Sequence, residues 1–122
     1  MILGIGCDIV KVDRISSIHA KFGKKFLNKI FTAYEIEQAP QLQDSFIRYL
    51  AKRFAVKEAF AKALGTGIGK SISFRDIEVI KNGNNQPQIR LLKELANIGK
   101  VHVSISDDAD YALAFVTIEN TP

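Results

Sequence analysis

The sequence lacks the features that mark secreted and membrane proteins. It contains a single cysteine, Cys7, so no disulfide can form within the chain, which fits a reducing compartment. No basic N-terminal start leads into a long apolar run, and no stretch approaches the length of a membrane span. Internal repeats, low-complexity tracts and recognisable DNA- or RNA-binding signatures are also missing. We therefore expect a cytoplasmic protein that binds neither membrane nor nucleic acid, with Cys7 as a small buried hydrophobe.

The composition is ordinary for a globular domain. Hydrophobic residues make up 47% of the 122 residues and charged residues 25%, which predicts one domain over residues 1–122. The 17 lysines and arginines exceed the 13 acids, giving a net charge of +4. A basic protein tends to have an acidic partner or a phosphorylated ligand. The charge alone does not choose between nucleic acid, nucleotide and acidic protein.

The pattern of hydrophobic residues predicts an α+β fold, with an antiparallel β-sheet packed around a long central helix. Strands are expected over residues 2–10, 74–80, 88–91, 101–106 and 111–119. One or two short helices are expected over 11–30, a long helix over 45–64 and a short helix over 92–97. Gly65 suits the left-handed position that ends a helix. Thr32 and Glu35 have the spacing of a capping box, so Glu35 is assigned a structural role.

One face of the first strand is nearly bare backbone. Gly4 and Gly6 lie on it, followed by the carboxylate of Asp8. Glycine inside a strand lowers stability, so two on one face indicate that a helix or a ligand comes very close there. Packing of a helix is the commoner explanation.

Residues 53–67, with the sequence RFAVKEAFAKALGTG, place charges in a helix that otherwise favours burial. At 100° per residue, Glu58 is the only acid on a face of small and apolar side chains. An ionised carboxylate in such a place must be paired or bind a metal. An ion pair with Lys62, four residues on, would be merely structural and worth about 0.2–0.5 kcal/mol. This segment alone leaves the structural and the metal-binding interpretations open.

The separated motifs together resemble those of the holo-acyl-carrier-protein synthases, which are small, single-domain 4′-phosphopantetheinyl transferases. The matching residues are GIGCDIV at 4–10, RI at 14–15, FTxxE at 31–35, RFAxKEAxxKALGTG at 53–67, SFxDIEV at 73–79, HVSIS at 102–106 and YAxA at 111–114. They keep the family's order and spacing over nearly the whole chain. Histidine on a strand is usually just a satisfied polar residue, but within this pattern His102 gains a functional interpretation.

The resemblance implies an activity. The family transfers the 4′-phosphopantetheine arm of coenzyme A to a serine of an acyl carrier protein, releases adenosine 3′,5′-bisphosphate and supports fatty acid biosynthesis. It needs Mg²⁺, whose ligands match Asp8 and Glu58, and two carboxylates suit a hard cation that completes its shell with water and phosphate oxygens. Lys62 is expected to be a second cation on the diphosphate. The group that accepts the serine proton is left open.

The resemblance also implies two binding surfaces and an assembly. Coenzyme A contacts are expected from Arg53, Lys62, Gly65, Thr66, Gly67, His102 and Ser104. An acidic carrier protein is expected on the first helices, at Arg14 from the family motif and at Lys21, Lys24 and Lys25 from their charge alone. Members are typically homotrimers with active sites between subunits. Two positions depart from the common pattern: Asn85 precedes Gln86-Pro87 in the hairpin loop, and Asp107 stands where many members have histidine.

The main rival is a basic nucleic-acid-binding module without enzymatic activity. Its support is the net charge and the lysines of residues 11–29. No strand carries a row of aromatic side chains for stacking on bases, which disfavours it. A non-catalytic interaction protein is disfavoured by the joint presence of Asp8, Glu58 and Lys62.

Overall fold

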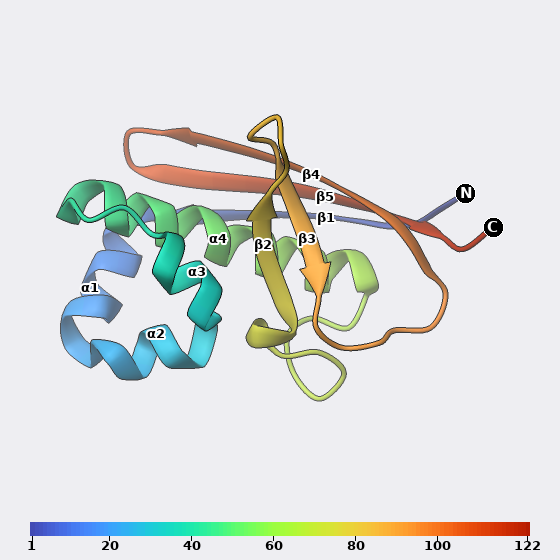
Figure 1. The fold of residues 1–122 in the computed structure, drawn as a ribbon, viewed down its shortest axis with the longest axis horizontal. Helices are drawn as coiled ribbons and strands as arrows, with labels where there is room; N and C mark the ends of the chain where they lie inside the picture. The colour runs from blue at the N-terminus through green and yellow to red at the C-terminus, as the bar shows by residue number, and fades with distance from the viewer.

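The computed structural model describes all 122 residues and has four α-helices and two antiparallel sheets. The long helix α4 packs across the larger sheet, while the short helices gather near its N-terminal end (Figure 1). The helices are α1 (Val12–Phe22), α2 (Lys24–Ile30), α3 (Ala33–Gln38) and α4 (Gln43–Leu64), with one 3₁₀ turn, η1 (Phe74–Asp76). The strands are β1 (Ile2–Lys11), β2 (Ile77–Lys81), β3 (Pro87–Leu91), β4 (Ile98–Asp108) and β5 (Tyr111–Asn120). The predicted fold class is confirmed.

The larger sheet has the strand order β1-β5-β4, and β2 pairs with β3 in a separate hairpin. Alternate residues of β5 face the helix and are buried, namely Ala112, Ala114, Val116 and Ile118. Two of them are alanines, whose small side chains let α4 lie close to the sheet. The helix and the inner face of the sheet thus form one continuous core.

Glycines in β1 bring the strand against the backbone of α4. A Cβ atom on Gly4 would lie 1.9 Å from the carbonyl oxygen of Ala63, and one on Gly6 would lie 1.9 Å from that of Ala59. Contacts this short exclude any side chain, so the bare strand face serves helix packing, as predicted. Gly4 thus faces Ala63, and Gly6, two residues further along β1, faces Ala59, one turn nearer the start of α4. Asp8 follows Gly6 by two residues and therefore lies beside the preceding turn of the helix.

A buried charge network ties the short helices to α4. Glu35 caps α3 as the sequence predicts: Thr32 N–H donates to its carboxylate at 2.9 Å, and Glu35 N–H donates to Thr32 Oγ1. The same carboxylate accepts from Val79 N–H at 2.8 Å and from Lys57 Nζ at 2.7 Å. Lys57 Nζ also donates to the carbonyls of Ile30 and Phe74, so its three donors are all used. The structural role of Glu35 is confirmed.

Three local predictions are wrong. Residues 92–97 form bends and a turn, because the segment must span from the end of β3 to the start of β4. Residues 74–76 form η1, with Ser73 and Asp76 as its capping box, so the strand starts at Ile77. The long helix also begins at Gln43, two residues before the predicted start.

Cys7 is exposed rather than buried. It lies on the outer face of β1, where no helix packs and large apolar side chains remain accessible. The exposed large apolar residues of this strand and its neighbour β5 include Leu3, Ile5, Ile9, Leu113 and Phe115. Ile5 and Ile9 are each 59% exposed, so the three-stranded sheet has an uncovered apolar face. None of the helices is long and apolar enough to cross a membrane.

Candidate active site

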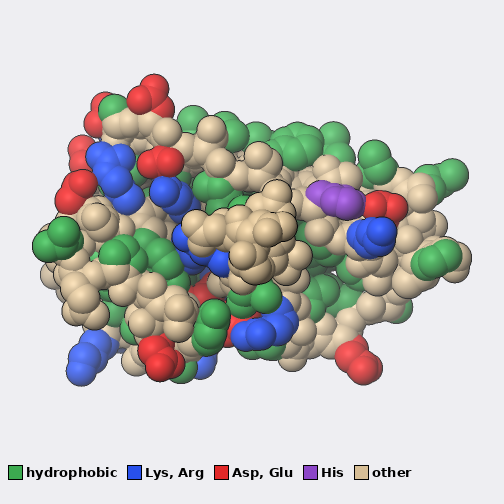
Figure 2. Space-filling view, turned by 45° about the horizontal axis from the view of Figure 1, so that its top comes forward, with side chains coloured by type: hydrophobic (Ala, Val, Ile, Leu, Met, Phe, Trp, Pro, Cys, Tyr) green, Lys and Arg blue, Asp and Glu red, His purple; other side chains and the backbone are tan.

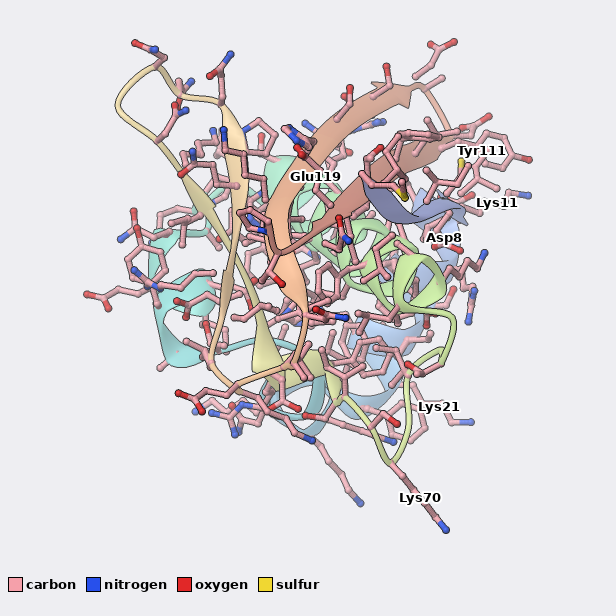
Figure 3. The ribbon with its side chains drawn as sticks, turned by 90° about the vertical axis from the view of Figure 1, so that its right-hand side faces the viewer. Asp8, Lys11, Lys21, Lys70, Tyr111 and Glu119 are labelled. Carbon is pink, nitrogen blue, oxygen red and sulfur yellow. The ribbon has the colours of Figure 1, made fainter.

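Asp8 and Lys62 form the centre of the first cluster of predicted residues. Lys62 Nζ lies 3.1 Å from Asp8 Oδ1 and donates to the carbonyl of Cys7 at 3.0 Å. The close contacts of Gly4 and Gly6 hold β1 against α4, and Asp8 lies on this strand beside the helix (Figure 3). The side chain of Asp8 is only 15% exposed. The ion pair of Glu58 with Lys62 is therefore absent, because Lys62 pairs with Asp8 and Glu58 forms no ion pair.

Glu58 lies half-buried beside this pair. Burial raises the pKa of its carboxyl, and the charge of Asp8 raises it further, while Lys62 and Arg14 act in the opposite direction. Two carboxylates therefore share one site, flanked by two cations. Carboxylate oxygens are the hard ligands that a divalent cation such as Mg²⁺ prefers, and no third acid or histidine joins these two.

The raised pKa of Glu58 predicts a pH-dependent stability difference. Between its ordinary value near 4.5 and the raised value, the folded protein binds more protons than the unfolded chain. The contribution of Glu58 to the stability of the wild type therefore falls as the pH rises through that window. Glutamine has no carboxyl that titrates. The free energy of unfolding of Glu58→Gln, taken relative to that of the wild type, should therefore increase from about pH 4 to about pH 7 when Mg²⁺ is absent. Urea denaturation at both pH values measures it, and a constant difference would contradict it.

An apolar groove opens next to Glu58. Its volume is ≈ 410 Å³, and it runs between α1, α2, α4 and η1. It is lined by Arg14, Ile18, Phe22, Lys25, Phe26, Lys29, Ile30, Phe54, Glu58 and Phe74. Phe54 and Phe74 stack with their ring centroids 5.4 Å apart, and the guanidinium of Arg14 lies over the Phe54 ring. The groove thus combines an apolar floor with basic edges. Of the predicted carrier-protein residues it contains Arg14 and Lys25, whereas Lys21 and Lys24 lie outside it.

Arg53 lies in a second cluster, away from Glu58. Its side chain is buried, with 7% of its surface exposed, its guanidinium lies 3.7 Å from the centre of the Tyr49 ring, and its Nε has no hydrogen-bond partner. Burial lowers the pKa of Arg53, and the nearby Tyr49 and Glu35 raise it in part. A buried cation with an unused donor is suited to receive an anion.

Two adjoining cavities, which we call the basic cleft, meet at Arg53. One of ≈ 590 Å³ lies between α3, α4 and β2, and the other, of ≈ 560 Å³, lies between α4, the β2–β3 hairpin and β4. They share Lys52, Arg53 and Lys81, and the second also contains His102 and Ser104. Lys and Arg side chains gather in the hollow beside the uncharged tip of the hairpin (Figure 2). The sequence motifs missed Lys52 and Lys81, which only the fold brings beside Arg53.

His102 has a partner at the edge of this cleft. Its Nε2 lies 2.6 Å from a carboxylate oxygen of Glu119, and both side chains are accessible. The hydrogen bond with His102 lowers the pKa of Glu119. Glu119 lies well away from Asp8 (Figure 3), so His102 belongs to the basic cleft and not to the Asp8 cluster.

The glycine segment after α4 owes its composition to backbone conformation. Gly65 ends the helix with φ 83°, as predicted, and Gly67 has φ 67°. A Cβ atom at either position would meet nothing within 4 Å, so crowding does not require these glycines. Thr66 Oγ1 donates to the carbonyl of Gly67 at 2.9 Å. The expected coenzyme A contact of this segment stays a prediction.

The predicted site residues therefore fall into two groups within one chain. Asp8, Glu58 and Lys62 gather at one side of α4, whereas Arg53 lies in the basic cleft. Residues 53 and 58 are five positions apart and project about 140° apart around the helix, so Arg53 lines the basic cleft whereas Glu58 lines the apolar groove.

Comparison with known proteins identifies the class of enzyme. The family model described as "4'-phosphopantetheinyl transferase superfamily" matches residues 4–116. A holo-[acyl-carrier-protein] synthase of Ehrlichia chaffeensis is 51% identical over 121 residues, which cover 97% of each chain. The chain thus belongs to the 4′-phosphopantetheinyl transferase superfamily, within its holo-[acyl-carrier-protein] synthase branch, and is a transferase.

Solved structures of the same branch have the same fold. The holo-[acyl-carrier-protein] synthase of Helicobacter pylori, in complex with coenzyme A, has a TM-score of 0.86 and 40% identity, and the match covers 94% of this chain and 99% of that one. The enzyme of Bacillus anthracis, in complex with "CoA (3',5'-ADP)", also has a TM-score of 0.86, with 37% identity and 99% coverage of both chains.

Proposed function

We propose that the protein transfers the 4′-phosphopantetheine group from coenzyme A to a serine of an apo acyl carrier protein, with Mg²⁺, and releases adenosine 3′,5′-bisphosphate. The reaction would supply holo carrier protein for fatty acid biosynthesis in the cytoplasm. The observation that carries the proposal is the gathering of Asp8, Glu58 and Lys62 beside the glycine-lined face of β1. The coenzyme A complexes of related enzymes support the same substrate.

Asp8 and Glu58 are the proposed magnesium ligands. Their shared, half-buried site raises the pKa of Glu58, and a divalent cation would relieve the repulsion that contributes to this shift. When bound, Mg²⁺ neutralises charge on the diphosphate that is being cleaved. Two protein carboxylates leave room for water and phosphate oxygens in its coordination shell.

Lys62 is the proposed second cation. Asp8 and the carbonyl of Cys7 hold its ammonium group at the site without burying it, because the side chain is 52% exposed. The same group can therefore donate to the oxygens of a bound diphosphate. This placement stabilises charge as it develops, which is the main catalytic contribution that phosphoryl transfer requires from a protein.

Arg53 and the basic cleft are proposed to bind the phosphates of the nucleotide end of coenzyme A. Since α4 separates Arg53 from Glu58, a complete site requires the cleft of one subunit to face the Asp8 cluster of another. The uncovered apolar face around Ile5 and Phe115 offers the surface for such an assembly. We therefore propose a homotrimer with active sites between subunits. A molar mass in solution, measured by light scattering, would test this oligomeric state.

The groove beside Glu58 is proposed to receive the carrier protein. Its apolar floor and the cations Arg14 and Lys25 at its edges fit an acidic helical partner. Arg14 is also close enough to lower the pKa of Glu58, so a carrier held there would present its serine to the metal site.

Replacing Arg14 by alanine should raise the KM for the carrier protein about 10-fold or more, because an arginine that packs on Phe54 and faces an acidic partner is lost. The KM for coenzyme A should stay unchanged. We further expect the KM of the wild type for carrier protein to rise with salt between about 0.05 and 0.3 M, since screening weakens the attraction. Steady-state kinetics with each substrate varied in turn measures both effects. An equal loss of affinity for both substrates would contradict docking at this groove.

The reaction is tested by chromatographic detection of adenosine 3′,5′-bisphosphate after incubation with coenzyme A, Mg²⁺ and apo carrier protein. Release should stop when the carrier's acceptor serine is replaced by alanine. Release that does not require the serine, or no release at all, would overturn the proposal.

A further inference from the structure

The basic cleft contains a single acid, Asp107. The remaining charged residues around its two cavities are Arg48, Lys52, Arg53 and Lys81, all positive. Asp107 lies near the end of β4, and its Oδ1 is 3.5 Å from Nζ of Lys52 on α4. The ion pair thus joins two walls of the cleft. Both side chains remain about one-third exposed, 33% for Lys52 and 35% for Asp107, so either can exchange its partner.

Of the two neighbouring cations of α4, Lys52 is paired with an acid and Arg53 is not. Arg53 forms no ion pair and has an unused Nε donor, whereas Lys52 is engaged by Asp107. An anion that enters the cleft can bind Arg53 without displacing an acid. To gain the charge of Lys52 as well, the anion must compete with a carboxylate that is already there.

We propose that Asp107 competes with the phosphates of the ligand for Lys52 and thereby weakens the binding of coenzyme A and of the bisphosphate product. This inference rests on the proposed function, because it takes those phosphates as the natural occupants of the cleft. The energy of an exposed ion pair of this kind corresponds to a change of about 2- to 5-fold in the affinity for the phosphorylated ligand. Asp107 is thus a residue that sets ligand affinity and does not take part in the chemistry.

Weaker binding here has a functional consequence. The bisphosphate product keeps the phosphates by which the cleft holds the substrate, so tight binding of the substrate implies slow release of the product. Product release limits turnover in many enzymes. A built-in competitor for Lys52 assists departure of the product without altering the groups that act on the reacting phosphorus.

The test compares two variants with the same change of charge. Asp107→Asn removes the competitor, whereas Asp13→Asn removes an exposed acid of α1 that forms no ion pair and does not line the cleft. The probe is adenosine 3′,5′-bisphosphate, titrated calorimetrically into the full chain. We expect Asp107→Asn to bind it about 2- to 5-fold more tightly than the wild type and Asp13→Asn to bind it as the wild type does. Unchanged or weaker binding by Asp107→Asn, or equal tightening in both variants, would overturn the proposal.

A double-mutant cycle separates competition from simple repulsion. If Asp107 acts by occupying Lys52, the tightening caused by Asp107→Asn should disappear in the background of Lys52→Met. If the carboxylate only repelled the ligand, the tightening would be as large or larger in that background, which would overturn the proposal. Wild-type protein that fails to bind the bisphosphate would overturn the proposed function as well, whereas binding without the Asp107 effect would overturn the competition alone.

Discussion

Replacing Glu58 by glutamine should lower the rate of turnover at saturating Mg²⁺ by at least about 100-fold, since even residues that merely support metal ligands contribute about 10- to 100-fold. Glutamine keeps the size of the side chain but supplies no negative charge to the site that Glu58 shares with Asp8. The fold should persist, because the Glu58 carboxylate forms no ion pair within the chain. Steady-state rates over a range of Mg²⁺ concentrations measure the effect.

The matched control is Glu37→Gln. Glu37 is an exposed residue of α3 without an ion-pair partner, and its replacement changes the net charge by the same amount. We expect this control to keep the wild-type rate and the wild-type dependence on Mg²⁺. If Glu58→Gln retained both as well, Glu58 would not be a magnesium ligand.

Replacing Lys57 by methionine should lower the free energy of unfolding by about 3–5 kcal/mol, the usual cost of removing one partner from a buried ion pair. Lys57 and Glu35 are both fully buried, and the change would leave the Glu35 carboxylate without its cation. It would also release the carbonyls of Ile30 and Phe74, which Lys57 holds. Urea denaturation monitored by circular dichroism measures the loss.

Two further variants sharpen this prediction. Lys70 projects into solvent from the loop after α4 (Figure 3), so Lys70→Met should change the free energy of unfolding by less than about 0.5 kcal/mol. The double variant Lys57→Met with Glu35→Gln should recover part of the loss, because no uncompensated charge stays buried. A loss below about 1 kcal/mol for Lys57→Met would mean that the buried pair contributes little to stability.

The sequence predicts the local features of the fold well where one physical rule dominates. The capping box of Thr32 and Glu35 and the left-handed Gly65 depend on a few neighbouring residues, and both were predicted correctly. The bare face of β1 was also interpreted correctly, because only a very close contact explains Gly4 and Gly6.

The errors arise where tertiary contacts override local preference. Cys7 is apolar enough for a core, but it lies on the face of β1 opposite to Gly4 and Gly6, and no helix covers that face. The segment 92–97 has helix-forming residues, yet it serves as a short connection between two strands.

In the candidate site, too, some residues are predictable from the local sequence and others only from tertiary contacts. Asp8, Glu58 and Lys62 could be named from their motifs, and the fold brings these three together. The pair of Lys52 with Asp107 could not be predicted, because its members lie 55 positions apart and meet only when β4 packs near α4. The motifs also group Arg53 with Glu58, although five helical positions place the two residues about 140° apart around α4.

The most direct measurement of the proposed reaction is the intact mass of an apo acyl carrier protein after incubation with this protein, coenzyme A and Mg²⁺. A relative such as the Helicobacter pylori enzyme serves as a positive control. The account predicts a mass increase of one 4′-phosphopantetheine group, absent without Mg²⁺ and strongly reduced with Glu58→Gln. An unmodified carrier protein in the complete mixture, with the relative succeeding alongside, would contradict it.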